Sequence, residues 1–197
     1  MTSALNDQSL DQIFRSARTP NGWADSPVED ATAREIYDLM KWGPTSANCS
    51  PARFVWARSA DGKATLAGLA AEPNRPKILK APVTVIFGHD LDFAGELPKL
   101  LPHVAEAMQK YFAAPGVAEV TAMRNGTLQG AYLIGAARAL GLDCGPMSGF
   151  DNADVDKVFF SGTRIQSNFI CSIGDGDPAS VFPRNPRLSF EEAGRWA

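Results

Sequence analysis

The sequence has few of the residues that build disulfide networks or zinc sites. It contains three cysteines, Cys49, Cys144 and Cys171, and two histidines among 197 residues. The cysteines are odd in number, far apart and without a C-x-x-C pair, so we expect no disulfide framework and no metal site. Small buried thiols are the favoured interpretation. A nucleophilic role for Cys49 is the alternative.

Long apolar runs and blocks of like charge are also missing. No apolar segment approaches the ~20 residues needed to cross a bilayer, and the first fourteen residues lack the basic and apolar regions of a secretory signal. The net charge is −3, and no run of like charge exceeds two residues. We therefore expect a soluble, cytoplasmic protein that binds neither membranes nor nucleic acid and acts on small molecules.

Motifs of several common enzyme classes are absent as well. The stretch 174–179 superficially resembles a dinucleotide fingerprint, but prolines at 178, 183 and 186 block the helix that such a fingerprint requires. The sequence has no Walker A motif, no H-E-x-x-H and no G-x-S-x-G. These absences argue against a Rossmann domain, a P-loop NTPase, a zinc protease and a serine hydrolase.

The hydrophobic pattern predicts more helices than strands. Helices are predicted at 10–17, 33–40, 61–70, 104–112, 121–140 and 151–159, and strands at 54–57, 83–87 and 169–173. The segment 83–87 is apolar on both faces, so it is expected at the centre of the sheet. Residues 143–150 are expected to form a tight loop. Because strands and helices do not alternate regularly, we predict one α+β domain over residues 1–197, with a mixed sheet flanked by helices.

Several segments between these elements are rich in hydrogen-bond donors. They are Pro44–Asn48 after a helix end, Asn74 with Lys77 before the central strand, Met147–Gly149, and the basic residues Arg18, Arg184 and Arg187. Guanidinium groups match phosphate oxygens, and a glycine lets backbone amides approach a ligand closely. Taken singly, each segment is better explained by ordinary turn chemistry.

In their order along the chain, these segments resemble the nitroreductase family. That family has an Arg-x-Ser-x-basic segment, a Pro-Ser-x-x-Asn-x-x-Pro loop, an Asn-x-x-Lys pair, a Pro-x-x-Gly-Phe loop and a basic pair near the C-terminus. The matching places here are Arg18-Thr19-Pro20-Asn21, Pro44-Thr45-Ser46-Ala47-Asn48 with Pro51, Asn74-x-x-Lys77, Pro146-Met147-Ser148-Gly149-Phe150, and Arg184 with Arg187. The resemblance covers nearly the whole chain.

The resemblance implies a nitroreductase-like fold in an intertwined homodimer, with two FMN molecules at the subunit interface and NADPH or NADH as co-substrate. One chain would supply Arg18, Thr19, Asn21, Asn74, Lys77, Arg184 and Arg187, and its partner Pro44, Thr45, Ser46 and Asn48. The loop Pro146, Met147, Ser148 and Gly149 would pack on the flavin, with the Ser148 amide facing N5. The flavin itself carries the hydride. Lys77 would stabilise the negative charge that reduction creates, and Arg18 and Arg187 would neutralise the phosphate.

Four segments, 21–23, 40–53, 145–151 and 186–193, resemble more narrowly the branch that reduces malonic semialdehyde in the Rut pathway of pyrimidine degradation. This implies NAD(P)H-dependent reduction of 3-oxopropanoate to 3-hydroxypropanoate. The alternatives are a broad-specificity nitroreductase or quinone reductase and, from another class, a non-catalytic flavin carrier. Arg53, Arg124 and His103 are candidate anchors for the substrate carboxylate.

Two positions depart from the family pattern. Asn21 stands where a basic residue is usual, so phosphate binding is expected to rely on Arg18 or Arg15. Ser148 stands where the family often has Glu, which removes a charge beside the flavin. Residues 91–121 match no family motif and are expected to cover the pocket and determine the substrate.

Overall fold

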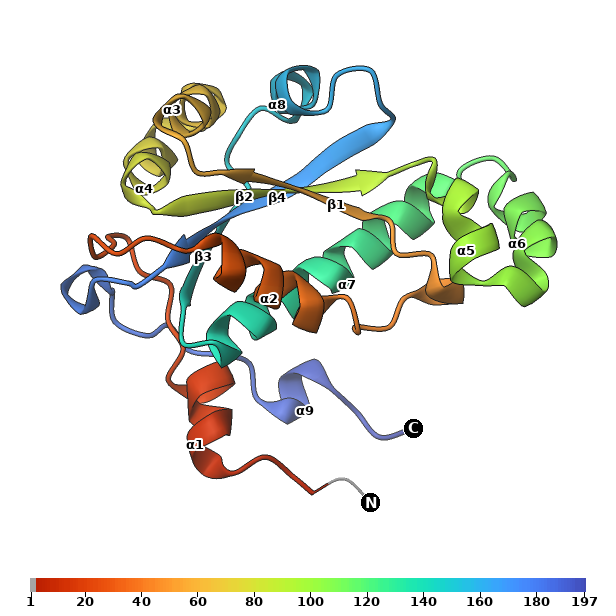
Figure 1. The fold of residues 1–197 in the computed structure, drawn as a ribbon. Helices are drawn as coiled ribbons and strands as arrows, with labels where there is room; N and C mark the ends of the chain where they lie inside the picture. The colour runs from red at the N-terminus through yellow and green to blue at the C-terminus, as the bar shows by residue number, and fades with distance from the viewer. Residues whose placement is uncertain (1–2) are drawn as a thin grey trace.

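The computed structural model describes residues 3–197, whose centre is one four-stranded sheet of order β1-β2-β4-β3 (Figure 1). The strands are β1 (Ala52–Ala57), β2 (Val83–Asp90), β3 (Asp143–Met147) and β4 (Ile165–Gly174). All three pairings between them are antiparallel. β2 has a neighbour on each side and is buried along nearly its whole length, which confirms the central strand predicted at 83–87.

Helices cover both faces of the sheet, as the predicted α+β class requires. In Figure 1, α2 (Asp30–Met40) and α7 (Val117–Ala139) lie below the sheet, and α3 (Ala60–Leu69), α4 (Arg75–Lys80) and α8 (Asn152–Phe159) lie above it. Each face has its own apolar core. Ile36 and Leu133 pack in the lower core, and Leu66, Ile78 and Val155 in the upper one.

The long helix α7 approaches the sheet closely because two of its inward positions are glycines. A Cβ atom at Gly130 would lie 2.6 Å from the Phe169 ring, and one at Gly126 would lie 2.9 Å from the Cβ of His89. Larger residues at these positions would push the helix outward. The two glycines therefore set the depth of α7 against the strands.

The predicted cover region forms a separate cluster of short helices at one end of the sheet. It comprises η4 (Phe93–Glu96), α5 (Leu97–Leu100), η5 (Pro102–Val104) and α6 (Ala105–Phe112). Phe93, Leu97 and Phe112 pack together with Ala122 of α7 and Cys49. The region therefore has its own apolar core, which reaches the loop before β1.

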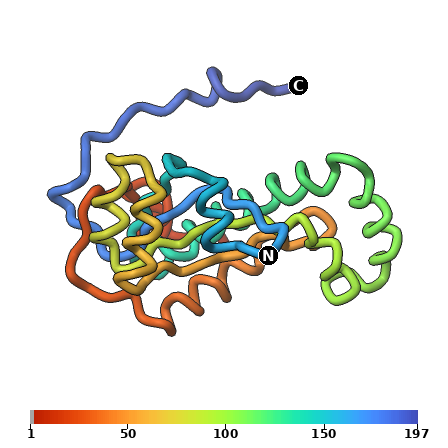
Figure 2. Tube along the Cα trace, turned by 90° about the horizontal axis from the view of Figure 1, so that it is seen from above, coloured from red at the N-terminus to blue at the C-terminus, as the bar shows by residue number. Residues whose placement is uncertain are grey.

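Both ends of the chain lie outside the layered core. The N-terminal segment contains α1 (Asp7–Leu10) and the π-helical η1 (Asp11–Arg15), where one continuous helix was predicted. After the short turn η6 (Pro178–Ser180), the C-terminal tail runs apart from the body and carries α9 (Phe190–Ala193) (Figure 2). Phe182, Leu188 and Trp196 on this tail are 71%, 69% and 89% exposed.

The prediction of a tight loop over residues 143–150 is wrong for the first half of that segment, because Asp143–Met147 forms β3. Gly145 and Pro146 obscure the strand in the sequence, since both are depleted in strands. β3 is an edge strand, where a proline is tolerated because one side of the strand needs no hydrogen-bond donor.

Among the helices of residues 3–197, none combines the length and hydropathy needed to cross a bilayer.

Candidate functional site

The N-terminal segment and the start of the C-terminal tail exchange hydrogen bonds. The Arg18 guanidinium donates to the carbonyl oxygen of Phe182, and the Asn21 side-chain amide donates to that of Ser180 at 3.0 Å. Arg184 donates back to two carbonyl oxygens of the N-terminal segment, at 2.7 and 3.1 Å. The structure thus ties Arg18, Asn21 and Arg184 into one region, which we call the anion clamp.

The other candidates for phosphate binding lie differently. Thr19 is exposed beside Arg18. Arg187 lies further along the tail, and its guanidinium donates to the carbonyl oxygens of the two preceding residues at 2.9 and 3.0 Å. Arg15 pairs with two aspartates of its own helical segment, at 2.8 and 2.6 Å. Within one chain, Arg15 and Arg187 therefore lie outside the anion clamp, whose two guanidinium groups are those of Arg18 and Arg184.

The second group of predicted site residues surrounds β3. The Asn74 side-chain amide donates to the carbonyl oxygen of Gly149 at 3.1 Å, and a Cβ atom at Gly149 would lie 2.8 Å from that amide nitrogen. In the middle of β3, a Cβ atom at Gly145 would lie 3.4 Å from the ring of Trp23. The half-buried Lys77 follows Asn74 on α4. Segments distant in sequence therefore meet along this edge of the sheet.

The residues between these contacts alternate in exposure. Pro146 and Ser148 are exposed, whereas Met147 is half-buried against the upper core. This alternation follows from the strand geometry, in which successive side chains point to opposite faces. Pro146, Ser148 and the backbone at Gly149 are therefore open to a ligand lying on this edge.

The loop Pro44–Asn48 lies at the opposite edge of the sheet. It precedes β1, whose first residue Ala52 pairs with His89, and His89 in turn pairs with Gln166 near the start of β4. β3 instead pairs with Ile170–Gly174 in the second half of β4. The two edge strands are three strand spacings apart, about 14 Å, and the loop lies further away along the sheet (Figure 1). Within residues 3–197, the two groups do not close around one ligand.

The loop before β1 has an unusual backbone. Ala47, Asn48 and Ser50 have φ angles of 51°, 49° and 38°. Such left-handed conformations disfavour residues other than glycine and cost about 1–3 kcal/mol each. Within the loop, the amide of Ser50 donates to the hydroxyl of Thr45 at 3.2 Å. A conformation of this cost persists only where the surroundings hold it.

Two buried amide side chains of α7 supply that support. Asn125 Oδ1 accepts from the backbone N–H of Ser46 at 2.8 Å, and Gln129 Oε1 accepts from that of Ala52 at 2.9 Å. The side chain of Asn48 donates to a carbonyl oxygen of α5 at 2.8 Å. Neither Asn125 nor Gln129 is among the predicted site residues. The feature of the sequence that points to them is a pair of amide side chains one turn apart in a helix of mostly small residues.

The thiol of Cys49 is fully buried in the cover-region core. Burial raises its pKa to about 11, although a hydrogen bond with Thr45 partly opposes this shift. Thiolate is the nucleophilic form of cysteine, so Cys49 is inert at neutral pH. Cys144 and Cys171 are buried as well, and the pKa of Cys171 is raised by its hydrogen bond with Cys144 and by burial. The favoured interpretation of buried thiols is confirmed.

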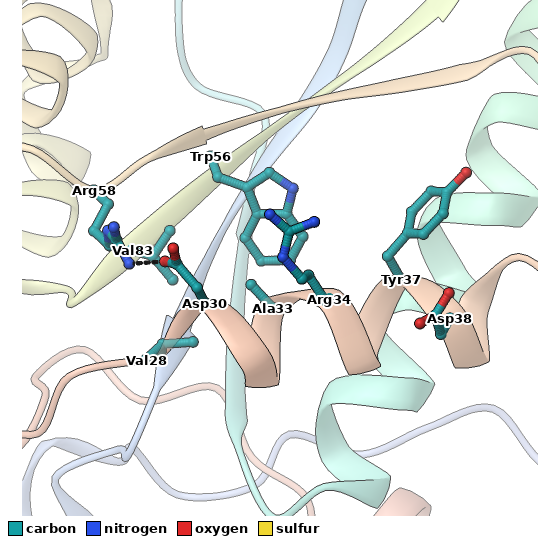
Figure 3. A pocket seen from close by; sticks show the side chains of 9 residues that line it. All are labelled: Val28, Asp30, Ala33, Arg34, Tyr37, Asp38, Trp56, Arg58 and Val83. Carbon is teal, nitrogen blue, oxygen red and sulfur yellow. Dashed lines mark hydrogen bonds and ion pairs between the residues drawn. The ribbon is translucent and has the colours of Figure 1, made fainter.

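A cavity lies elsewhere, between α2 and β1 (Figure 3). Its volume is about 610 Å³, and it is lined by Val28, Asp30, Ala33, Arg34, Tyr37, Asp38, Trp56, Arg58 and Val83. Asp30 is the first residue of α2, and its carboxylate pairs with Arg58. None of the predicted site residues lines this cavity.

The three candidate anchors for a substrate carboxylate lie in different surroundings. Arg53 forms an ion pair with Asp90 at 2.9 Å and donates to the carbonyl oxygens of Ser50 and Ala52, so its guanidinium is already engaged. Arg124 on α7 and His103 on η5 are exposed. The structure therefore favours the latter two over Arg53.

Comparison with known proteins identifies relatives along almost the entire chain. The model of the "Nitroreductase family" matches residues 15–174. A protein of Caulobacter sp. (strain K31) named "Putative NADH dehydrogenase/NAD(P)H nitroreductase" is 59% identical over 97% of both chains. A protein of Ralstonia pickettii with the same name and the suffix HadB is 59% identical over 94% of this chain and 95% of its own.

Solved structures with lower sequence identity share the fold. A nitroreductase-type structure from Bacillus subtilis superposes with a TM-score of 0.88 at 17% identity and covers 98% of this chain and all of its own. One from Exiguobacterium sibiricum, solved in complex with FMN, has a TM-score of 0.87 at 20% identity over the whole of both chains. The family match and the close relatives agree, and the chain belongs to the nitroreductase family.

Proposed function

We propose that the protein is an FMN-dependent NAD(P)H oxidoreductase of the nitroreductase type that works as a homodimer. The observation that carries the proposal is the division of its donor-rich segments between two edges of one sheet. The anion clamp and the β3 edge offer one half of a flavin site, and the loop Pro44–Asn48 offers the other. The names of the close relatives and the FMN bound in the Exiguobacterium structure support the same activity.

The hydrogen-bond donors of the anion clamp and the β3 edge suit FMN. The phosphate carries close to two negative charges, which the guanidinium groups of Arg18 and Arg184 would neutralise. Asn74 and Lys77 offer an amide and a cation for the polar edge of the ring system. The Asn74 amide fills the space beside Gly149 and holds its carbonyl oxygen, so the backbone at this position would be fixed next to the ring. Arg187 would join the phosphate if the tail moved when the dimer forms.

A second copy of the chain would complete the site. Val120, Met123, Leu128 and Tyr132 on the outer face of α7 are about half exposed. Apolar side chains gathered on one helix face mark a surface for association, and a two-fold dimer would pair this face with itself. The partner's loop Pro44–Asn48 would then lie beside the β3 edge. The exposed apolar residues of the tail support the same assembly.

Bound FMN would supply the redox chemistry by accepting hydride from NAD(P)H and passing it to an acceptor. The residues of the chain would provide binding, orientation and charge. The ammonium group of Lys77 would stabilise negative charge as it develops on the flavin, because a fixed charge needs no reorganisation during the reaction. The cover region, with its own apolar core, would exclude water from the face where the substrates bind.

For the acceptor, we propose malonic semialdehyde, reduced in the cytoplasm as a step of pyrimidine degradation. The segments 40–53 and 145–151 support this choice by their resemblance to that branch of the family. The exposed side chains of Arg124 and His103 are the candidate anchors for its carboxylate. The relatives' names equally support a broad-specificity nitroreductase, which is the second candidate.

An acceptor screen tests both levels of the proposal. The pure protein should show a flavin spectrum. Its activity should then be measured with NADPH and with NADH as the donor, each combined with 3-oxopropanoate, propanal or a nitroarene as the acceptor. Without a carboxylate, propanal should have a kcat/KM at least about tenfold lower, since 1.4 kcal/mol is a modest share of a charge-assisted contact. If propanal or the nitroarene matches 3-oxopropanoate, the broad-specificity function replaces the semialdehyde. A protein that binds no flavin would refute the whole proposal.

A further inference from the structure

Asn125 is a buried polar residue with both ends of its amide engaged. Its side chain is on α7 and is 1% exposed. The oxygen accepts from the backbone N–H of Ser46 at 2.8 Å, and the nitrogen donates to the carbonyl oxygen of Thr121 at 2.9 Å. The second bond fixes the orientation of the amide, so its oxygen points at the loop. A buried amide with this geometry acts as a fixed acceptor for one backbone group.

We propose that Asn125 is a positioning residue that holds the loop Thr45–Ser50 in the conformation in which it binds the cofactor of the neighbouring subunit. This inference rests on the proposed function. It adds to that function a residue that belongs to none of the predicted binding segments. Asn125 would not touch the flavin and would act through Ser46.

The backbone of the loop explains why it needs such a residue. Three of its residues have left-handed φ angles without being glycines, so the free loop would relax to other conformations. Its bonds within the loop do not fix its place relative to the rest of the chain. Asn125 attaches its start at Ser46, Asn48 attaches its middle to α5, and Gln129 attaches the following strand at Ala52.

The position of Asn125 links the loop to the proposed dimer interface. Gly126, the next residue, packs against β2 and sets the depth of the helix at this point. Met123 and Leu128 on the same stretch are exposed on the outer face. One turn of α7 thus contacts the loop on its buried side and would contact the second copy on its outer side. The loop would therefore keep a fixed position relative to the partner's site.

Amide hydrogen exchange in the apo protein tests the positioning role without any cofactor. Asn125→Leu keeps the branched shape and the number of heavy atoms of the side chain and removes both hydrogen bonds, and it should speed exchange at Ser46 at least about tenfold while the amides of β2 and β4 are unchanged. Asn125→Asp retains an acceptor oxygen and should give an intermediate rate. Thr127→Val is the matched control, because Thr127 lies on the same helix and its hydroxyl forms hydrogen bonds with Met123 and Asn168 rather than with the loop.

Titration of the apo proteins with FMN tests the consequence for binding. If the loop occupies its bound conformation only about one tenth of the time in Asn125→Leu, the apparent Kd for FMN should rise about tenfold. The Kd of Thr127→Val should stay within about twofold of the wild-type value.

Each result decides one point. Unchanged exchange at Ser46 in Asn125→Leu would overturn the inference, as would equal rates in the Asp and Leu variants. If the Leu variant does not fold, the comparison of Asn125→Asp with the wild type decides. Faster exchange with an unchanged Kd would overturn the link to cofactor binding. A wild-type protein that binds no FMN would refute the proposed function, and the exchange rates would still decide whether Asn125 holds the loop.

Discussion

The substitution Gly130→Ala should destabilise the fold even though alanine favours a helix. Replacing glycine by alanine inside a helix contributes about 0.8–1.0 kcal/mol through propensity. Against this, the new Cβ would lie 2.6 and 2.8 Å from two atoms of the Phe169 ring and 3.2 Å from Phe87. Carbon atoms in contact need about 3.5–4.0 Å, so the ring would have to move by roughly 1 Å.

Phe169 cannot move freely, because it belongs to a row of packed rings. It stacks on Phe87 with centroids 4.2 Å apart and an interplanar angle of 14°, and Phe87 meets Phe54 edge to face at 5.4 Å. Overpacking of a dense core typically costs about 1–3 kcal/mol. With strain at the upper end of that range, the net loss should be about 1–2 kcal/mol, or about 5 °C in Tm for a chain of this length.

Urea unfolding of the apo protein at fixed concentration measures this loss. Gly68→Ala in α3 is the matched control, because no atom lies within 4 Å of its new Cβ. That variant should be as stable as the wild type or more stable by up to about 1 kcal/mol. Phe169→Leu should relieve the contact, so the double variant should lose less than the sum of the single losses. A Gly130→Ala protein as stable as the wild type would refute the close-approach argument.

Three further predictions concern the thiol, the interface and the clamp. Because the pKa of Cys49 is raised from 9.0 to about 11, the unfolded chain loses this proton first, and the free energy of unfolding should fall by about 1.4 kcal/mol per pH unit between pH 9 and 11. Cys49→Ala should lack that component in urea unfolding, and identical pH profiles would contradict it. Leu128→Asp should turn a sedimenting dimer into a folded monomer, and a persisting dimer would exclude this helix face from the interface. Arg18→Ala and Arg184→Ala should each lose about 2–4 kcal/mol of FMN affinity, and full flavin content after dialysis would remove that arginine from the phosphate site.

The sequence predicts those elements whose pattern is local. The central strand is readable because Val83–Phe87 is apolar and β-branched, and α8 because Asp151 caps it, as the bond from the Asp154 amide confirms. β3 could not be read because its hydrogen bonds come from β4, which compensates for the weak strand propensity of Gly145 and Pro146. The first residues of β4 are largely polar and were missed for the same reason.

The candidate site likewise has parts that the sequence predicts and parts that depend on the folded structure. The order of the donor-rich segments predicts which residues share a site; the chain brings Arg18 to the tail and Asn74 to Gly149, and their binding role stays a prediction. The bond between Asn125 and Ser46 joins residues 79 positions apart. It depends on how closely α7 packs against the sheet. That distance is set by the contacts of Gly126 and Gly130 in the folded chain and not by any local sequence pattern.

The anion clamp joins the two ends of the chain, and this has a consequence for synthesis. Arg18 and Phe182 are 164 positions apart, and the bonds of Arg184 to the N-terminal segment span 167 and 169 positions. At roughly 5–20 residues per second on the ribosome, about 10–30 s separate the emergence of Arg18 from that of its partner. A prematurely terminated chain could form much of the sheet but not the clamp. Under the proposed function, in which the clamp binds the flavin phosphate, such a chain would therefore bind the cofactor less tightly than the complete one.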